Sequence, residues 1–455
     1  MRTVAATLLL ATGLAAPALA QEDLDLTLIP TATQPPPSAP DVSTAHQDRL
    51  FIESDVGLAG RRNDLPLAPP PPAAADATAR VDLDLRLHRD WADGLSATVS
   101  DRFGGSWQSD LSFPSHRAVD NDLREAYLGL QPADGTFLEA GRINIRNGVA
   151  QGYNPTDFFK SRSLVQQANA DPQALRNNRL GAFLVHAEQL WDNGSAGLSF
   201  APRLASPGPI QAQPPGGFDP HADRTNASDR LLLTLSQEVA DLSPQVLLYH
   251  QADRTRYGLN LSHPVGKAVI LYAEWAGGDQ RPLAAEAIAF GRRTGTLPTG
   301  VPLPFSGGDA TFRSDATAGL SWTSDSALSI NAEIIVHQAG LSRRQWSAWY
   351  GVSPQPSLFW YIRSYAADQQ EPASQRQAFL RLSWTDVFVP HLDVTAFALT
   401  SLADGSTVGQ WAATYDLSDR WSLGAYLSAN LGGPKSQYGS LPETTGLTFQ
   451  AIRYF

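Results

Sequence analysis

The strongest constraint on the fold is an alternation of apolar and polar residues that recurs along most of the chain. In VDLDLRLH (81–88) every second residue is Val or Leu, and the residues between them are Asp, Arg or His. WSLGAYLSAN (421–430) repeats the alternation near the other end of the sequence. Successive side chains of a strand point to opposite faces, so each stretch predicts a strand with one apolar and one more polar face. The sequence therefore predicts an all-β protein.

The length of these stretches and the pattern of their connections indicate a membrane. The stretches are about ten residues long, which suits a tilted strand that crosses a bilayer. Their connections alternate between short turns, such as DNGS and TSDS, and long segments. This pattern is typical of a transmembrane antiparallel β-barrel, whereas a soluble sandwich has no reason to keep its short turns at one end. We predict a barrel over residues 49–455, with long external loops at 61–78, 104–121, 148–179, 204–228, 277–312 and 430–444.

The strand number follows from requiring both termini of the barrel on one side of the membrane. Bacterial single-chain barrels have an even number of strands. Residues 50–60 must then form an additional strand near the start of the chain. QWSAWYG (345–351) must form another one, before the alternating stretch at 357–365. The tally is 20, and we predict 18–20 strands, with 16 as a further option. A barrel of this width has an aqueous lumen unless something fills it.

The first residues predict export from the cytoplasm. Residues 1–20 combine an early arginine, an apolar run and the small-residue ending Ala-Leu-Ala, which is typical of a cleaved signal peptide. Residues 21–48 are rich in proline and poor in apolar residues, which predicts a disordered periplasmic segment. The chain contains no cysteine, so disulfides, thiol nucleophiles and cysteine metal sites are excluded.

Aromatic residues mark the predicted strand ends. Five tryptophans lie in or beside short turns and are predicted to form a girdle at the membrane interface: Trp91, Trp191, Trp322, Trp384 and Trp421. The chain closes with TGLTFQAIRYF, and Phe455 resembles the C-terminal signal of Gram-negative outer-membrane proteins. Arg453 departs from that pattern, which prefers an apolar residue there. The resemblance implies assembly by the barrel-assembly machinery into an outer membrane whose lipids include lipopolysaccharide.

The polar faces of the predicted strands collect ionisable residues, which are expected to face the lumen. The residues predicted to line the pore and set its selectivity are Arg86, Arg102, Glu125, Arg142, Arg146, Glu188, Asp315, Glu333 and Arg381. Asp82, Asp84, His186 and Glu274 belong to the same inward set. Two interpretations remain open: the charges solvate the wall and pair across strands, or they filter solutes near a constriction. Since both signs occur, the sequence does not decide between anions and cations.

The most distinctive stretch is residues 141–181, which begins GRINIRNGVAQGYNPTDFF. Arg142, Asn144 and Arg146 are expected on one face of a strand that leads into a long basic loop with its own apolar residues. The loop is predicted to fold into the pore as a constriction, through Tyr153, Asn154, Asp157, Lys160 and Arg162. A flap packed on the external rim is the alternative. With LREAYLGL (123–130), the pattern resembles a family of largely uncharacterised proteobacterial outer-membrane barrels, over about 60 residues.

The sequence predicts a channel rather than an enzyme. No phosphate-binding loop, dinucleotide-binding glycine pattern or HExxH motif occurs, and no cofactor or metal site is predicted. The net charge of −11 argues against nucleic-acid binding. We predict a porin-like outer-membrane channel for diffusion of small polar or charged solutes. Two alternatives stay open: an export or surface-assembly component for a polymer such as an acidic exopolysaccharide, and a plugged structural or receptor barrel.

Overall fold

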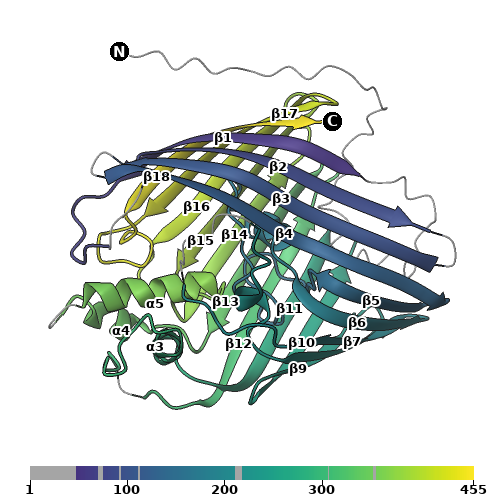
Figure 1. Ribbon diagram of the computed structural model, residues 1–455, viewed down its shortest axis with the longest axis horizontal. Coiled ribbons are helices and arrows are strands. Elements are labelled where there is room, and N and C mark those ends of the chain that lie inside the picture. Colours follow the sequence, from purple (N-terminus) through teal and green to yellow (C-terminus); the bar gives the residue numbers. More distant parts are fainter. Residues whose placement is uncertain are drawn as a thin grey trace.

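The protein folds into one closed antiparallel β-barrel of 18 strands (Figure 1). The computed structural model describes residues 48–69, 75–91, 94–110, 113–210, 218–305, 307–351 and 355–455. Strands that follow each other in the chain are paired, and the last strand closes the barrel by pairing with the first. The predicted all-β barrel is thus confirmed, at the lower end of the predicted strand number. The predicted signal peptide and nearly all of the proline-rich segment lie outside the described residues.

The strands take up most of the chain between Arg49 and Tyr454. They are β1 (Arg49–Arg61), β2 (Ala77–Asp90), β3 (Leu95–Asp110), β4 (Phe113–Ala133), β5 (Thr136–Ile143), β6 (Ala182–Trp191), β7 (Gly194–Ala201), β8 (Arg230–Gln237), β9 (Gln245–Gln251), β10 (Arg254–Val265), β11 (Val269–Gln280), β12 (Thr311–Thr323), β13 (Leu328–His337), β14 (Arg376–Trp384), β15 (Leu392–Ser401), β16 (Thr407–Ser418), β17 (Trp421–Leu431) and β18 (Glu443–Tyr454).

The barrel wall is apolar outside and polar inside. On β2, the side chains of Val81 and Leu83 are 56% and 43% exposed, whereas Asp82 and Asp84 between them are 1% and 2% exposed. The same alternation holds on most strands, with exposed Leu, Val and Phe in the outward rows. A soluble barrel would bury its apolar row, so the outward apolar surface is the one that a lipid environment requires.

The connections differ between the two ends of the barrel. The backbone N–H of Phe455 donates to the carbonyl of Leu50 (3.0 Å), which places the C-terminus beside the start of β1, at the end with the short turns. The long connections, including 62–76, 144–181, 202–229, 281–310, 338–375 and 432–442, leave from the opposite end. Residues 104–121 depart from the expected loop, because β3 and β4 continue pairing through this range and form one long hairpin.

Two predicted strands, 345–351 and 357–365, are wrong. Residues 349–351 are in no strand, and residues 345–348 and 357–365 are helical. They lie in α4 (Arg343–Ala348) and α5 (Pro356–Asp368). Ser342 and Gln345 form a reciprocal capping box at the start of α4, and proline occupies the first turn of α5. The buried residues of α5 recur every three or four positions, which is the helical period. Removing these two strands turns the tally of 20 into the observed 18.

Three further helices lie in the long connections: α1 (Pro172–Asn177), α2 (Ala222–Thr225) and α3 (Leu283–Arg293). No helix among the described residues has the length and apolar character needed to cross a membrane. Helices α3, α4 and α5 lie together at one end of the barrel (Figure 1).

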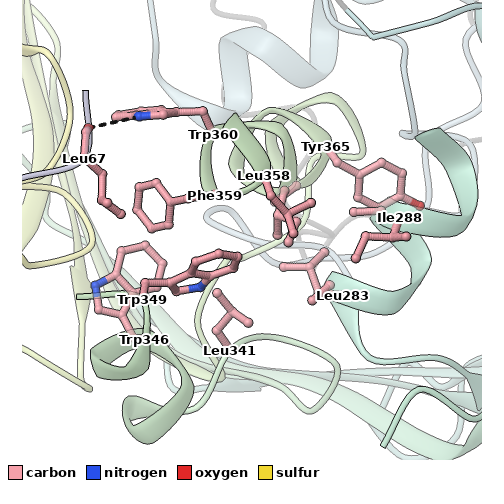
Figure 2. Packing of buried hydrophobic residues seen from close by; sticks show 14 of the residues in the cluster. Leu67, Leu283, Ile288, Leu341, Trp346, Trp349, Leu358, Phe359, Trp360 and Tyr365 are labelled. Atoms are coloured by element: carbon pink, nitrogen blue, oxygen red, sulfur yellow. Dashed lines mark hydrogen bonds between the residues drawn. The ribbon is translucent and has the colours of Figure 1, made fainter. Parts of the chain in front are cut away.

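The largest hydrophobic core lies in this helical group and not in the barrel. We call α3, α4, α5 and the Leu67 segment that packs on them the outer cap. Phe359 is at its centre, with its ring 5.4–5.6 Å from those of Trp346, Trp349 and Trp360 (Figure 2). The ring of Tyr350 lies 5.9 Å from it. The indole N–H of Trp360 donates to the carbonyl of Leu67 (3.1 Å), which ties the β1–β2 connection to α5.

Candidate pore and its internal segment

The connection from β5 to β6, residues 144–181, folds into the barrel; we call it the internal segment. It bonds to inward-facing side chains on strands all round the wall, from β11 and β13 on one side to β2 and β16 on another. A stretch that reaches these strands must pass through the lumen. These contacts place the segment against the inner wall, and its role as a constriction stays a prediction.

The carboxylate of Glu274 on β11 is the first anchor of the internal segment. It accepts hydrogen bonds from the backbone N–H groups of Val149 and Ala150, the latter at 2.5 Å. The side chains of Asn154 and Thr156 donate to it as well, both at 3.1 Å. Hydrogen bonds to an ionised acceptor are stronger than neutral ones. One buried wall carboxylate thus holds four donors of the segment.

A second anchor, Glu333 on β13, continues the pattern. Its carboxylate accepts the backbone N–H groups of Gln151 (2.6 Å) and Gly152 (3.0 Å). The hydroxyl of Tyr272 on β11 donates to the same carboxylate (2.8 Å). The stretch from Val149 to Gly152 therefore presents four consecutive backbone donors to two wall carboxylates.

Gly148 allows this approach between the segment and the wall. Its φ of +95° lies in the region that favours glycine. A Cβ atom at this position would lie only 2.5 Å from a carboxylate oxygen of Glu274. Only a residue without a side chain fits between the segment and its anchor.

Aromatic packing and a buried ion pair complete this side. The ring of Phe158 stacks on that of Tyr249 on β9, with centroids 4.6 Å apart. Within the segment, Arg179 pairs with both carboxylate oxygens of Asp157 at 2.8 and 2.9 Å. Such bidentate pairs fix geometry as well as charge. The same guanidinium donates to the side chain of Asn144 (2.7 Å), which joins the two ends of the segment to each other.

The far part of the segment bonds to β2 and β16, and to β14, which is the neighbour of β13. Arg80 on β2 donates to the carbonyl of Gln166. The amide side chain of Gln410 on β16 accepts from Ala170 N (2.8 Å) and donates to Ala168 O (3.0 Å). Further along, Arg381 on β14 donates to Asp171 (2.7 Å), whose other carboxylate oxygen caps α1. This side is held by isolated polar bonds rather than by a shared pair of carboxylates.

The internal segment is also bonded to the outer cap. The side chain of Arg162 donates to the carboxylate of Asp368, at the end of α5 (3.0 Å), and its backbone N–H donates to the Asp368 carbonyl (2.7 Å). Arg162 adopts a φ of +60°. Gln370, just beyond α5, donates to the hydroxyl of Ser163 (3.0 Å). Movement of the cap would therefore act directly on the segment.

The predicted constriction residues are together inside the barrel, but all five are buried. Lys160 donates to the carbonyl of Asn154 (2.8 Å) and lies 4.0 Å from the centroid of the Tyr153 ring. Burial lowers the pKa of Lys160, while the charges of Glu371 and Asp157 act in the opposite direction. These side chains hold the segment together; in this structure they do not present free charges to a solute.

The predicted pore-lining residues fall into two groups. Arg102, Asp315, Glu333 and Arg381 are buried and bonded, whereas Arg86, Glu125 and Glu188 are at least partly exposed on the inner wall. A bulge in β4, where Ser100 pairs with Glu125 and Asp101 with Leu123, inserts Arg124 between the paired residues.

Arg142, Asn144 and Arg146 do not share one strand face as predicted, because β5 ends at Ile143. Arg142 is fully buried, donates to the carbonyl of Pro220, and has its guanidinium carbon 5.1 Å from the centroid of the Phe183 ring. Arg146 belongs to the internal segment and donates to Asn177 (2.5 Å). The chain leaves the wall earlier than its polarity pattern indicates, since the segment's contacts outweigh further strand pairing.

Glu274 is among the residues predicted to face inward, but its role as an anchor is not predicted. Three further residues that contact the internal segment are not predicted at all: Thr317, Gln410 and Asp368. Thr317 on β12 donates to the carbonyl of Tyr153 (2.8 Å). The inward position of Glu274 on a predicted strand was the only available signal. Nothing local in the sequence marks its partners, which lie more than 100 residues away along the chain.

The five predicted girdle tryptophans all lie at strand ends beside short turns: Trp91 after β2, Trp191 at the end of β6, Trp322 near the end of β12, Trp384 at the end of β14 and Trp421 at the start of β17. Phe455 follows β18 and is exposed. Their roles in membrane contact and in barrel assembly stay predictions.

Comparison with known proteins adds solved structures but no family. No protein-family model matches the chain, and no curated protein matches it. A triple mutant of Rhodopseudomonas blastica porin is similar over 90% of this chain and 100% of its own, with 9% identity and a TM-score of 0.41. A structure described as "Asymmetric conductivity of engineered proteins" has the same coverage and identity, with a TM-score of 0.40.

Proposed function

We propose that this protein is a porin-like outer-membrane channel for small polar or charged solutes, in which the internal segment limits passage. The observation that carries the proposal is a closed 18-stranded barrel, apolar outside and polar inside, with residues 144–181 bonded to its inner wall. The outward apolar surface and the tryptophans at the strand ends support a Gram-negative outer membrane, in contact with lipids that include lipopolysaccharide. Phe455 is proposed as the signal for the barrel-assembly machinery.

A plugged barrel is the second candidate, and the course of the internal segment favours it. The segment contacts β11 and β13 as well as β2 and β16, so it crosses the lumen instead of following one wall. Export of an acidic polymer receives no such support. The basic side chains Lys160, Arg162, Arg176 and Arg179 are already bonded to carboxylates or backbone carbonyls.

Single-channel conductance in planar bilayers tests the proposal. The purified barrel is compared with a variant that lacks residues 150–178, and with Arg344→Ala in the outer cap as a matched control. We expect steady conductance from the protein, a severalfold increase on deletion, and no change in the control. Heat-dependent mobility on gels checks that each variant is a folded barrel.

The other outcomes have definite meanings. A silent protein whose deletion variant conducts is a plugged channel, which favours the second candidate. If both folded forms stay silent, the diffusion channel is ruled out and a structural or receptor barrel remains.

A further inference from the structure

Three carboxylates converge on the inner wall of β1 and β2. Each of Glu53, Asp55 and Asp82 offers an oxygen atom, and these three atoms all lie within 4.8 Å of one another. The register pairs Glu53 directly with Asp82, and Asp55 follows two residues later on the same face of β1. All three side chains are buried. Like charges placed opposite each other on paired strands are destabilising unless a cation lies between them.

Arginines neutralise only part of this cluster. One nitrogen of Arg102 on β3 donates to both Glu53 and Asp82, at 2.7 Å each, and Arg80 pairs with Asp82 at 2.7 Å. Asp55 accepts no hydrogen bond from an arginine: its side chain is 7% exposed and is bonded to the side chains of Gln450 and Glu53, and no donor among the described residues reaches its Oδ1 atom. A buried carboxylate oxygen without a partner is costly, so it indicates a missing positive group.

The wall around the cluster has the same excess of negative charge. Asp84 and Asp120 each also have a carboxylate oxygen with no hydrogen-bond partner among the described residues. Four inward carboxylates on β1 and β2 share three guanidinium groups: Glu53, Asp55, Asp82 and Asp84 against Arg80, Arg102 and Arg124. A divalent cation would reduce this imbalance without a new side chain.

Gly104 on β3 positions one of the three carboxylates. Gly104 pairs with Asp82, and a Cβ atom on it would lie 1.7 Å from the Asp82 Oδ1 atom. The Asp82 carboxylate therefore lies against bare backbone, where only glycine leaves room for it. The acidic cluster thus depends on a small residue placed opposite it.

We propose that Glu53, Asp55 and Asp82 bind a divalent metal ion, with Ca²⁺ as the preferred one. Carboxylate oxygens are the ligands that hard cations select, and Ca²⁺ holds them at roughly 2.3–2.6 Å in flexible geometry. Oxygens around one Ca²⁺ are then at most about 5 Å apart, which the cluster satisfies. Arg102 holds Glu53 and Asp82 in place, and Arg80 donates to the other oxygen of Asp82 (2.9 Å), so the ion shares an Asp82 oxygen with an arginine. The ion joins β1 and β2, next to the β1–β18 pair that closes the barrel.

Tb³⁺ luminescence on the full-length folded barrel tests the site, because Tb³⁺ replaces Ca²⁺ and is sensitised by nearby tyrosine. Tyr426 is suitably placed, since its hydroxyl donates to Gln450 (2.8 Å), which pairs with Asp55. We expect saturable binding that Ca²⁺ displaces more effectively than Mg²⁺ or arginine. Asp55→Asn should weaken the affinity roughly tenfold or more, since it removes one of three charged ligands.

A matched control comes from a second cluster. Asp219, His221 and Asp223, in the β7–β8 connection, also converge within 4.8 Å but are partly exposed. Asp223→Asn should leave Tb³⁺ binding unchanged. Gly104→Ala should weaken binding by displacing Asp82, so it gives a second variant if Asp55→Asn does not fold.

Three results would overturn the proposal: no saturable binding to the folded protein, equal affinity in Asp55→Asn, or loss of binding in Asp223→Asn. Stronger displacement by arginine than by Ca²⁺ would mean an organic-cation site instead of a metal site. The Tb³⁺ experiment measures metal binding and does not depend on conductance. A negative result would therefore reject the metal site without affecting the channel proposal.

Discussion

The outer cap and the internal segment are both inserted between strands, yet they are held in opposite ways. The cap buries a continuous aromatic and aliphatic core around Phe359 and brings its own hydrophobic stabilisation. The internal segment depends on the wall: its backbone donates to Glu274 and Glu333, and its far part bonds to Arg80 and Gln410. Burial of apolar surface is insensitive to the charge of any one group, whereas anchoring by carboxylates is not.

This difference suggests which of the two regions can move alone. A segment fixed by a few charge-assisted hydrogen bonds detaches when those acceptors are removed or protonated. A cap with its own core stays folded when one surface contact is lost. Arg162 and Asp368 join the two regions, so the cap can stabilise the segment.

The largest effect should come from removing both wall carboxylates. The double variant Glu274→Ala and Glu333→Ala deprives the segment of the acceptors for its four consecutive backbone donors. Bonds to charged groups contribute roughly 1.5–3 kcal/mol each, so docking should weaken by on the order of 5 kcal/mol or more. We expect a severalfold rise in single-channel conductance. Arg344→Ala, on the exposed face of α4, is the control. Equal conductance in all three proteins would refute the anchoring role.

The cap should respond to loss of its core without releasing the barrel. Phe359→Ala removes the central ring, and comparable substitutions cost about 3–5 kcal/mol. Proteolysis should then cut the 338–375 connection faster, while the barrel keeps its heat-dependent mobility on gels. Arg344→Ala, on the exposed face of α4, should change neither. If Phe359→Ala also unfolds the barrel, the cap is not an independent unit.

The ion pair between the internal segment and the outer cap should contribute less free energy than the two wall carboxylates or the core around Phe359. A double-mutant cycle of Arg162→Ala and Asp368→Ala is expected to show a coupling of roughly 1–2 kcal/mol, because the pair is largely buried and charge-assisted. Hydrogen exchange of the backbone amides in residues 158–166 gives the required free energies. Additive effects of the two substitutions would mean that the cap does not stabilise the segment.

The smallest effect is a dependence of this docking on pH. Burial raises the pKa of Asp368 above its ordinary value of 3.8, although the charge of Arg162 acts in the opposite direction. Because the pKa of Asp368 is higher in the docked state than in the detached state, Asp368 is protonated more often when the segment is docked, at pH values just above 3.8. Docking therefore becomes weaker as the pH rises through this range. Hydrogen exchange of residues 158–166 should therefore quicken with pH more than intrinsic exchange does, and Asp368→Asn should abolish the difference. Slower exchange at the higher pH would contradict the sign.

The sequence alone determined the barrel, because its evidence is local. Alternation over about ten residues fixes the two faces of each strand, and the strand at 50–60 was found because both termini must lie on one side. Local pattern failed at 345–351 and 357–365, where apolar residues of a helical core were interpreted as strands. A capping box at Ser342 and a proline at the start of α5 are the helix signals in this stretch. The strand at 345–351 was predicted from parity, and the one at 357–365 from its polarity pattern.

Only the tertiary structure decided what the inward charges do. Glu274 and its partner Ala150 are 124 residues apart, and no local pattern shows that one accepts a hydrogen bond from the other. Likewise, Glu53 and Asp82 face each other only because β1 pairs with β2 across a long connection. Strand polarity depends on neighbours in the chain and was therefore predictable. The state of each buried charge depends on distant residues that the closed barrel brings within a few ångströms, so it had to be read from the fold.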